Sequence, residues 1–191
     1  MSGTLKSISV TEEGQPDGFE APLLYKGQVG PDGTTRLVVS APVDELPRIH
    51  RRLIEALSAP LGVLWVQLVD RSTSTRQEDS PKRWITLEQE APKVLGALSA
   101  CAELLYEDGR GQLWIRGALG EQLVLDELGL IYLYPDDSSF REVLAEAGVE
   151  ESDTETMAER DFVRVEFVAS ADALETTLLA DLSMQPMASS S

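Results

Sequence analysis

Val63-Leu-Trp-Val-Gln-Leu-Val69 is apolar on both of the alternating sets of positions that a strand turns to its two faces. A strand with water on one side carries polar residues at every second position, so this run predicts a strand that is covered on both sides. We therefore expect it to lie centrally in a sheet, with the other elements of the chain arranged around it.

Upstream of this run, the sequence predicts a hairpin followed by a helix. Strands over 23–29 and 35–40 flank Gly30-Pro-Asp-Gly33, which supplies the fixed φ and the left-handed position of a tight turn. Asp44 can cap a helix that runs to about Ala59. Apolar residues recur along this helix at three- and four-residue steps and form one core-facing side: Leu46, Ile49, Leu53 and Leu57.

Downstream, a polar loop leads to a helix and then to a meander. Residues 71–83 have no apolar period and predict a loop, after which Thr86 and Gln89 have the spacing of a capping box. The following helix carries an apolar stripe over 91–105 and is expected to be the longest of the chain. Three short alternating runs then predict a β-meander: residues 112–116, 122–126 and 130–134.

The last part of the chain predicts two more helices with a strand between them. Gly148 is placed to end the first of these helices, because glycine readily adopts the left-handed conformation that follows many helices. The elements in order are a helix opened by a capping box at 139–142, an acidic loop over 149–160, a strand over 162–168 and a helix opened by Asp172 and Glu175.

The resulting order, ββαβαβββαβα, predicts an α+β fold. We expect a largely antiparallel sheet of about six to seven strands with four helices mainly on one face. A chain of 191 residues with 42% hydrophobic residues can bury a sizeable core. Residues 1–20 are expected to be a flexible N-terminal segment, 21–183 a single domain and 184–191 a disordered tail.

Charge is divided unevenly along the chain. Residues 1–83 hold 10 Lys and Arg against 11 Asp and Glu, whereas residues 84–191 hold 6 against 22. So acidic a segment repels nucleic acid, phosphate-rich ligands and anionic membrane surfaces, because each of these needs positive charge to neutralise it. We therefore expect a basic protein partner rather than a nucleic acid or a membrane.

Several features predict a cytoplasmic protein. The N-terminus lacks the continuous apolar run of a signal peptide, and no stretch approaches the roughly 18 apolar residues of a membrane span. The single cysteine, Cys101, cannot form an internal disulfide, which suits a reducing compartment. The absence of Asn and the excess of Arg over Lys, 12 to 4, favour a bacterial origin.

The sequence contains no recognisable catalytic, cofactor or metal motif. Its one histidine, His50, stands beside the apolar side of the first helix, where a hydrogen-bonded residue at the core boundary is the more common role than proton transfer. Cys101 lies on an apolar helical side and is expected to be an inert buried thiol. No glycine-rich nucleotide loop, nucleophile elbow or zinc-ligand cluster occurs.

Trp84 and the acidic loops are the candidates for a contact surface. Trp84 stands beside Lys82 and Arg83, so that it would anchor an interface if exposed and fix the end of the loop if buried. Trp65 and Trp114, on predicted strands, are expected in the core. The acidic candidates are Asp126, Glu127, Asp136, Asp137, Glu150, Glu151, Asp153 and Glu155.

Basic residues of the first helix and the polar loop would form one positive surface if these two elements are neighbours. Such a surface would pair with the chain's own acids or with an acidic patch of a second subunit in a homodimer. The residues concerned are Arg48, His50, Arg51, Arg52, Arg71, Arg76, Lys82 and Arg83.

In size and charge the chain resembles the stand-alone immunity proteins that neutralise bacterial toxins, and this resemblance implies an acidic surface that meets a basic nuclease domain. The residues favour an acidic, non-enzymatic protein-binding module, with an immunity-type inhibitor as its narrower form. Two alternatives remain open. A self-associating or structural adaptor predicts a stable multimer, and a small-ligand binder or enzyme with carboxylates in a cleft predicts a deep pocket.

Overall fold

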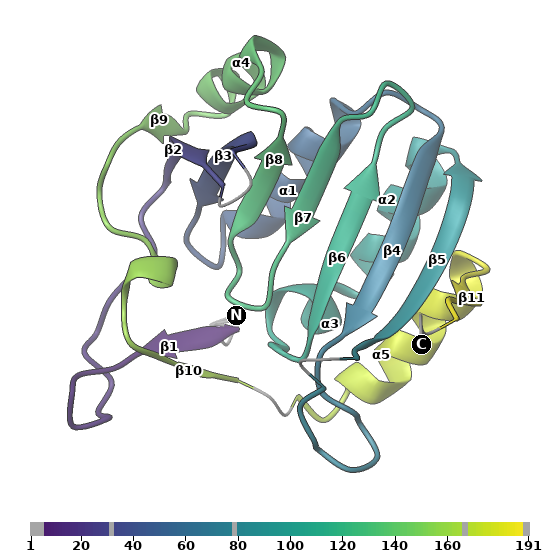
Figure 1. Ribbon diagram of the computed structural model, residues 1–191, viewed down its shortest axis with the longest axis horizontal. Coiled ribbons are helices and arrows are strands. Elements are labelled where there is room, and N and C mark those ends of the chain that lie inside the picture. The colour runs from purple at the N-terminus through teal and green to yellow at the C-terminus, as the bar shows by residue number, and fades with distance from the viewer. Residues whose placement is uncertain (1–5, 31–32, 78–79, 166–167, 189–191) are drawn as a thin grey trace.

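The computed structural model describes residues 6–30, 33–77, 80–165 and 168–188. Within these residues it confirms the α+β class, with a nine-stranded sheet, a separate two-stranded ribbon and five α-helices (Figure 1). The main sheet contains β2 (Leu24–Val29), β3 (Thr35–Ser40), β4 (Leu61–Gln67), β5 (Lys82–Gln89), β6 (Gly111–Arg116), β7 (Gln122–Leu125), β8 (Ile131–Tyr134), β9 (Glu150–Glu151) and β11 (Gln185–Pro186). The ribbon pairs β1 (Ser7–Ser9) with β10 (Phe162–Arg164).

The strands of the main sheet follow the order β11-β5-β4-β6-β7-β8-β3-β2-β9. Every described pair is antiparallel except β2 with β9. The helices are α1 (Leu46–Glu55), α2 (Ala91–Ala100), α3 (Ala102–Tyr106), α4 (Ser138–Glu146) and α5 (Ala171–Asp181), with a 3-10 turn, η1 (Met157–Glu159). The sheet is thus larger than the six to seven strands expected from the sequence.

The helices lie on one face of the sheet, and the hydrophobic core fills the space between the two layers. In Figure 1, β4, β6 and β7 lie in front of α1, α2 and α3, while α4 contacts α1 and α5 contacts α2 and α3. Alternate strand residues enter this core, among them Val63 and Trp65 of β4 and Leu113 and Ile115 of β6. We call the opposite face, on which no helix of the described residues lies, the open face.

β4 is an interior strand, as the apolar run at 63–69 predicts, but it is not covered on both sides. Val63 and Trp65 pack against the helices and are buried. Leu64, on the open face, keeps part of its side chain in contact with solvent. The open-face set of β4 is therefore enclosed at Val66, which is buried, but Leu64 has no covering layer among the described residues.

Two expectations around β5 are wrong. Thr86 and Gln89 do not cap a helix, because both belong to β5, and Glu90 takes the N-cap position of α2 instead. Thr86 is the register partner of Val63 on β4, so strand pairing overrides the local capping signal. The long helix expected over 91–105 is interrupted at Cys101, whose φ of −112° and ψ of 30° separate α2 from α3.

Further boundaries also differ from those expected. Glu45, not Asp44, takes the N-cap position of α1, and α1 ends at Glu55 rather than near Ala59. Asp137 caps α4, and Gly148 follows that helix with a φ of 79°, as its position predicts. The expected turn at 30–33 and strand at 162–168 lie partly outside the described residues.

Both ends of the described chain are attached to the fold. Residues 7–9, expected in a flexible segment, form β1, and the preceding Lys6 is buried. Gln185 and Pro186, expected in a disordered tail, pair with Ile85 and Trp84 of β5. These contacts join segments that are distant in sequence, so local composition did not indicate them.

A buried charged network holds α5 against the sheet. Glu175 of α5 accepts hydrogen bonds from Trp65 Nε1 at 2.6 Å, Gln67 Nε2 at 2.8 Å and Arg71 Nε at 2.8 Å. A second carboxylate, the fully buried Asp108, is held by Arg110, and the guanidinium of Arg71 lies 3.6 Å from it. Glu175, which was expected to help open the last helix, is therefore a buried carboxylate that links this helix to the sheet.

Gly111 allows the Trp65 ring to approach the backbone of β6 closely. A Cβ at this position would lie 2.5 Å from Cη2 of Trp65. We expect Gly111→Ala to lower the free energy of unfolding by about 1–3 kcal/mol, because the buried ring has to move. Gly96→Ala is the control, since a Cβ there meets nothing within 4 Å, and alanine in the middle of α2 should stabilise it by about 0.5–1 kcal/mol. Urea unfolding measures both variants, and equal effects would contradict the steric explanation.

Candidate functional site: the open face of the sheet

A row of apolar side chains crosses six strands on the open face. Register partners always project from the same face of a sheet, and here each member of the row is the partner of the next. Val38 and Val124 are the shortest members and are buried, whereas the others are partly exposed. The row, which we call the apolar row, consists of Val38, Tyr132, Val124, Trp114, Leu64 and Ile85.

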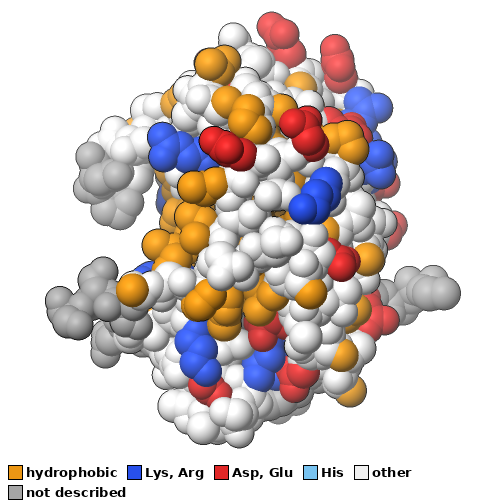
Figure 2. All heavy atoms as spheres, turned by 90° about the vertical axis from the view of Figure 1, so that its right-hand side faces the viewer, with side chains coloured by type: hydrophobic (Ala, Val, Ile, Leu, Met, Phe, Trp, Pro, Cys, Tyr) orange, Lys and Arg blue, Asp and Glu red, His pale blue; other side chains and the backbone are white. Residues whose placement is uncertain are grey.

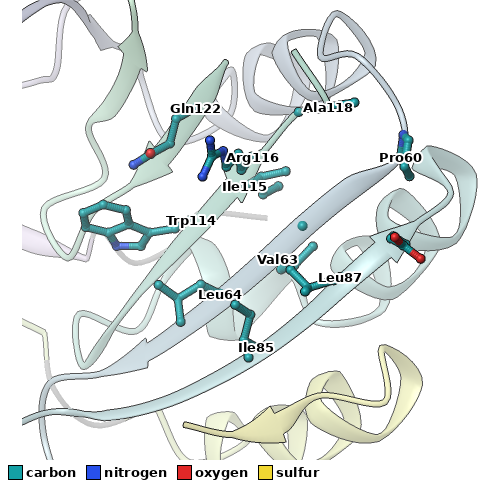
Figure 3. Close-up of a pocket in the computed structure, with 13 residues that line it drawn as sticks. Pro60, Val63, Leu64, Ile85, Leu87, Trp114, Ile115, Arg116, Ala118 and Gln122 are labelled. Atoms are coloured by element: carbon teal, nitrogen blue, oxygen red, sulfur yellow. The ribbon is translucent and has the colours of Figure 1, made fainter. Parts of the chain in front are cut away.

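A hollow of about 480 Å³ lies at the β5 end of the apolar row (Figure 3). Trp114 stands on one side of it and Leu87 on the other, with Leu64 between them. Gly62 also lines the hollow, and a Cβ at Gly62 would be 3.5 Å from Cδ2 of Leu87, an ordinary contact distance. The hollow therefore exists partly because residue 62 has no side chain.

A β-bulge turns Leu87 outward at the rim. Leu61 pairs with Gln89 and Val63 with Thr86, so β5 has one residue more than β4 in this interval. Glu88 has a φ of 57° within this bulge, and Leu87 is 64% exposed. Figure 2 looks onto the β5 edge, and hydrophobic side chains gather along the left side of this view, where the surface is hollowed.

Three arginines of the open face have no carboxylate partner among the described residues. Arg36 stacks on Tyr132, with its guanidinium carbon 4.5 Å from the ring centre, and donates to Tyr134 Oη at 2.7 Å. Arg83 and Arg116 are exposed and make no ion pair within the described residues. Because 33 Asp and Glu face only 16 Lys and Arg in this chain, uncompensated arginines on one face are a notable feature.

Two arginines away from the open face, Arg141 and Arg160, are bound by the chain's own acids. Arg141 holds Asp136 through two contacts of 2.8 Å and Glu151 at 2.7 Å, and its hydrogen bonds lower the pKa of Asp136. Arg160 pairs with Glu155. Three of the acidic candidates are therefore at least partly neutralised within the chain.

Comparison of the chain with protein-family models, with curated proteins and with solved structures gives no match. Among the described residues, no three His, Cys, Asp or Glu side chains are grouped so as to hold a metal ion. No helix in this part of the chain is long and apolar enough to cross a membrane. The argument about function therefore rests on the surfaces themselves.

The remaining acidic candidates divide into structural and free groups. Asp126 is buried and accepts backbone N–H groups of its own turn, and burial raises its pKa to about 6. Asp137 accepts the N–H of Ser139 at 2.7 Å as the N-cap of α4. Glu127 accepts a hydrogen bond from Gln112 at 2.6 Å. Glu150 and Asp153 are exposed and make no ion pair within the described residues.

Of the three tryptophans, Trp65 lies in the core as expected and Trp114 does not. Trp84 is half-buried, packs against the core and has Pro186 of β11 as its register partner. Trp114, expected in the core, belongs to the apolar row and is partly exposed. The signal that could have identified Trp114 is the alternation of Leu113, Trp114 and Ile115, in which Trp114 must face away from the two buried residues.

The one histidine is buried away from the hollow. His50 is fully buried, its Nδ1 lies 2.9 Å from Tyr106 Oη, and burial lowers its pKa to about 3. Lys6 donates to the carbonyl oxygens of Asp126 at 2.6 Å and Gly111 at 3.2 Å, and burial lowers its pKa to about 8. Neither residue lines the hollow.

The thiol and the expected basic surface also have structural roles. Cys101 is buried as expected, and burial raises its pKa. The basic residues do not form one positive surface, because Arg71 is enclosed by the α5 network and Lys82 pairs with Asp70 at 2.6 Å. Arg48 and Arg51 pair with acids of the α1 region.

Proposed function

We propose that the protein is a non-enzymatic binding module that receives a segment of another protein on its open face. The observation that supports this most strongly is the apolar row, which crosses six strands without a covering layer among the described residues. Removing apolar surface from water contributes roughly 25 cal/mol per Å². A partner that covers the row therefore gains binding free energy without any change in the sheet.

The groups that line the hollow favour binding over catalysis. Its charged and amide side chains are Glu88, Arg116 and Gln122, and no histidine, cysteine or lysine is among the described residues around it. Nucleophilic or acid–base catalysis needs a nucleophile and a base within hydrogen-bond distance of each other. The carboxyl whose pKa is raised, that of Asp126, does not line the hollow.

The narrower hypothesis of an immunity-type inhibitor places the contact on the acidic loops. Glu150 and Asp153 are the acids that support it, because both are exposed without an ion pair in the described part of the chain. An electrostatic contact of exposed charges weakens as salt is raised, whereas apolar contacts do not. Salt dependence therefore distinguishes the two surfaces.

Affinity capture from a lysate of the native cells tests the proposal with three baits. They are the wild type, Leu64→Asp in the apolar row and the double variant Glu150→Lys with Asp153→Lys. We expect the wild type and the double variant to retain the same protein at low and high salt. We expect Leu64→Asp to lose it, because a buried unpaired carboxylate at the contact costs several kcal/mol.

Lys93→Asp on α2 is the matched control for adding a carboxylate, because Lys93 is exposed on the helix side. Circular dichroism checks that each bait is folded. Loss of the protein from the double variant alone, with release by salt, would favour the inhibitor hypothesis over the open face. Retention of only a second copy of the chain would favour the adaptor.

A further inference from the structure

The hollow and Arg116 together indicate what a partner has to carry. Resting on the proposed function, we infer that the hollow takes one large apolar side chain of the partner and that Arg116 pairs with a carboxylate beside that side chain. The binding segment is therefore apolar and acidic at this point, the opposite of the basic partner expected from net charge.

The shape of the hollow favours a single anchoring side chain. Its apolar walls come from three neighbouring strands, with Leu64 on β4, Trp114 on β6 and both Ile85 and Leu87 on β5. Protein interfaces concentrate their binding energy in a few side chains that enter such pockets, and the surrounding contacts exclude water. The missing side chain of Gly62 leaves room beneath the anchor.

The position of Arg116 makes it the group that pairs with the partner's carboxylate. Arg116 is the register partner of Gly62 and lines the hollow. The acid closest to it in sequence is Glu121, just before β7, and this side chain is already engaged, accepting from Ser58 N at 3.1 Å and Leu119 N at 3.0 Å. The guanidinium is thus left for a carboxylate from outside, which it can bind through two parallel hydrogen bonds.

Glu88 determines on which side of the hollow a partner carboxylate can lie. This exposed carboxylate also lines the hollow and makes no ion pair within the described residues. A partner carboxylate is attracted to Arg116 and repelled by Glu88, so it should occupy only the Arg116 side. Because the whole chain has a net charge of −17, the complementarity is a local contact and not a general attraction for acidic proteins.

Selection from a displayed library of random peptides tests the inference without a known partner. The full-length wild type, Arg116→Glu and Arg52→Glu are used as targets, Arg52 being an exposed arginine of α1 without an ion pair in the described residues. We expect the wild type and Arg52→Glu to select peptides with a large apolar residue next to Asp or Glu. Arg116→Glu should select Lys or Arg at that place instead.

Fluorescence polarisation of one selected peptide then measures the affinities. We expect Arg116→Glu to weaken binding by about tenfold or more and Arg52→Glu to leave it within about twofold. Gly62→Leu should abolish binding while the protein stays folded, because its Cβ has room beside Leu87 and the rest of its side chain would occupy the hollow. Light scattering tests whether a second copy of the chain occupies the hollow instead. A dimer that Gly62→Leu dissociates would overturn the inference.

The two proposals fail in different ways. Suppose that Trp114→Ala loses binding while Arg116→Glu and Arg52→Glu bind equally well. This result would support the open face as the docking surface and overturn the inference that Arg116 pairs with a partner carboxylate. Peptides that bind every open-face variant as well as the wild type would overturn both proposals. If Gly62→Leu binds every selected peptide as tightly as the wild type does, the inference that an apolar side chain enters the hollow is overturned.

Discussion

Replacing Glu175 with alanine is expected to lower the free energy of unfolding by about 3–5 kcal/mol. The substitution leaves Trp65 Nε1, Gln67 Nε2 and the guanidinium of Arg71 without the carboxylate that they share. These groups are buried or nearly so, and water does not replace the lost hydrogen bonds at the sheet. Urea unfolding followed by tryptophan fluorescence measures the loss.

Asp172→Ala is the matched control on the same helix. Asp172 also contacts Arg71, at 2.9 Å, and Arg110, at 3.1 Å, but its side chain is 57% exposed. We expect a loss below about 1 kcal/mol, because a solvent-exposed carboxylate contributes little to an ion pair. Equal losses for the two variants would show that burial of Glu175 is not what makes its network important.

Acidification from pH 6.5 towards pH 3 is expected to destabilise the protein through His50. Burial lowers the pKa of His50 from 6.5 to about 3, so between these values the unfolded chain binds a proton that the folded chain does not. Stability is therefore fully present above pH 6.5 and lost as the pH falls. With about 1.4 kcal/mol for each pKa unit, the loss is on the order of 4 kcal/mol.

His50→Gln and Tyr106→Phe separate this effect from the general acid response. His50→Gln removes the titrating group, so its free energy of unfolding should fall less between pH 6.5 and 3. Tyr106→Phe removes only the hydrogen-bond partner and should keep the pH dependence. Carboxylates with a lowered pKa, such as Asp17, which a hydrogen bond from Arg160 holds at about 2, contribute equally in all variants.

Asp126 acts in the opposite direction. Burial raises its pKa to about 6, so the folded chain binds a proton between pH 6 and the ordinary value of 3.8 that the unfolded chain lacks. This carboxyl therefore adds stability as the pH falls. We expect Asp126→Asn to lose stability on acidification more steeply than the wild type, and a shallower loss would contradict the assignment.

The fold was largely predictable because most elements have local patterns. The run at 63–69, the meander over 112–134 and the helices carry periods that follow from burying one side of a strand or helix. β5 was missed because its outer residues, Lys82 and Arg83, are charged and Thr86 mimics a capping residue. Its strand conformation depends on pairing with β4 and β11, which no local pattern encodes.

The candidate site was much less predictable. The apolar row joins Val38 to Ile85 through partners that are far apart in the chain, and only the register brings them onto one line. The sequence indicated the acids as the contact surface because it shows charge but not pairing. Only the structure shows that Arg141 and Arg160 neutralise several of those acids, while Arg116 has no carboxylate partner among the described residues.

The sequence by itself determined the α+β class, the interior position of residues 63–69 and the buried thiol, because these follow from local periodicity and composition. The sequence also showed that both sides of the strand at 63–69 are apolar, but it did not indicate that one of them lacks a helix layer in the part of the chain that the structure describes. The tertiary structure decided which face the helices occupy, which carboxylates are bound by arginines and where the hollow opens. These properties arise from contacts between distant residues, and their energies depend on burial, which a linear pattern does not specify.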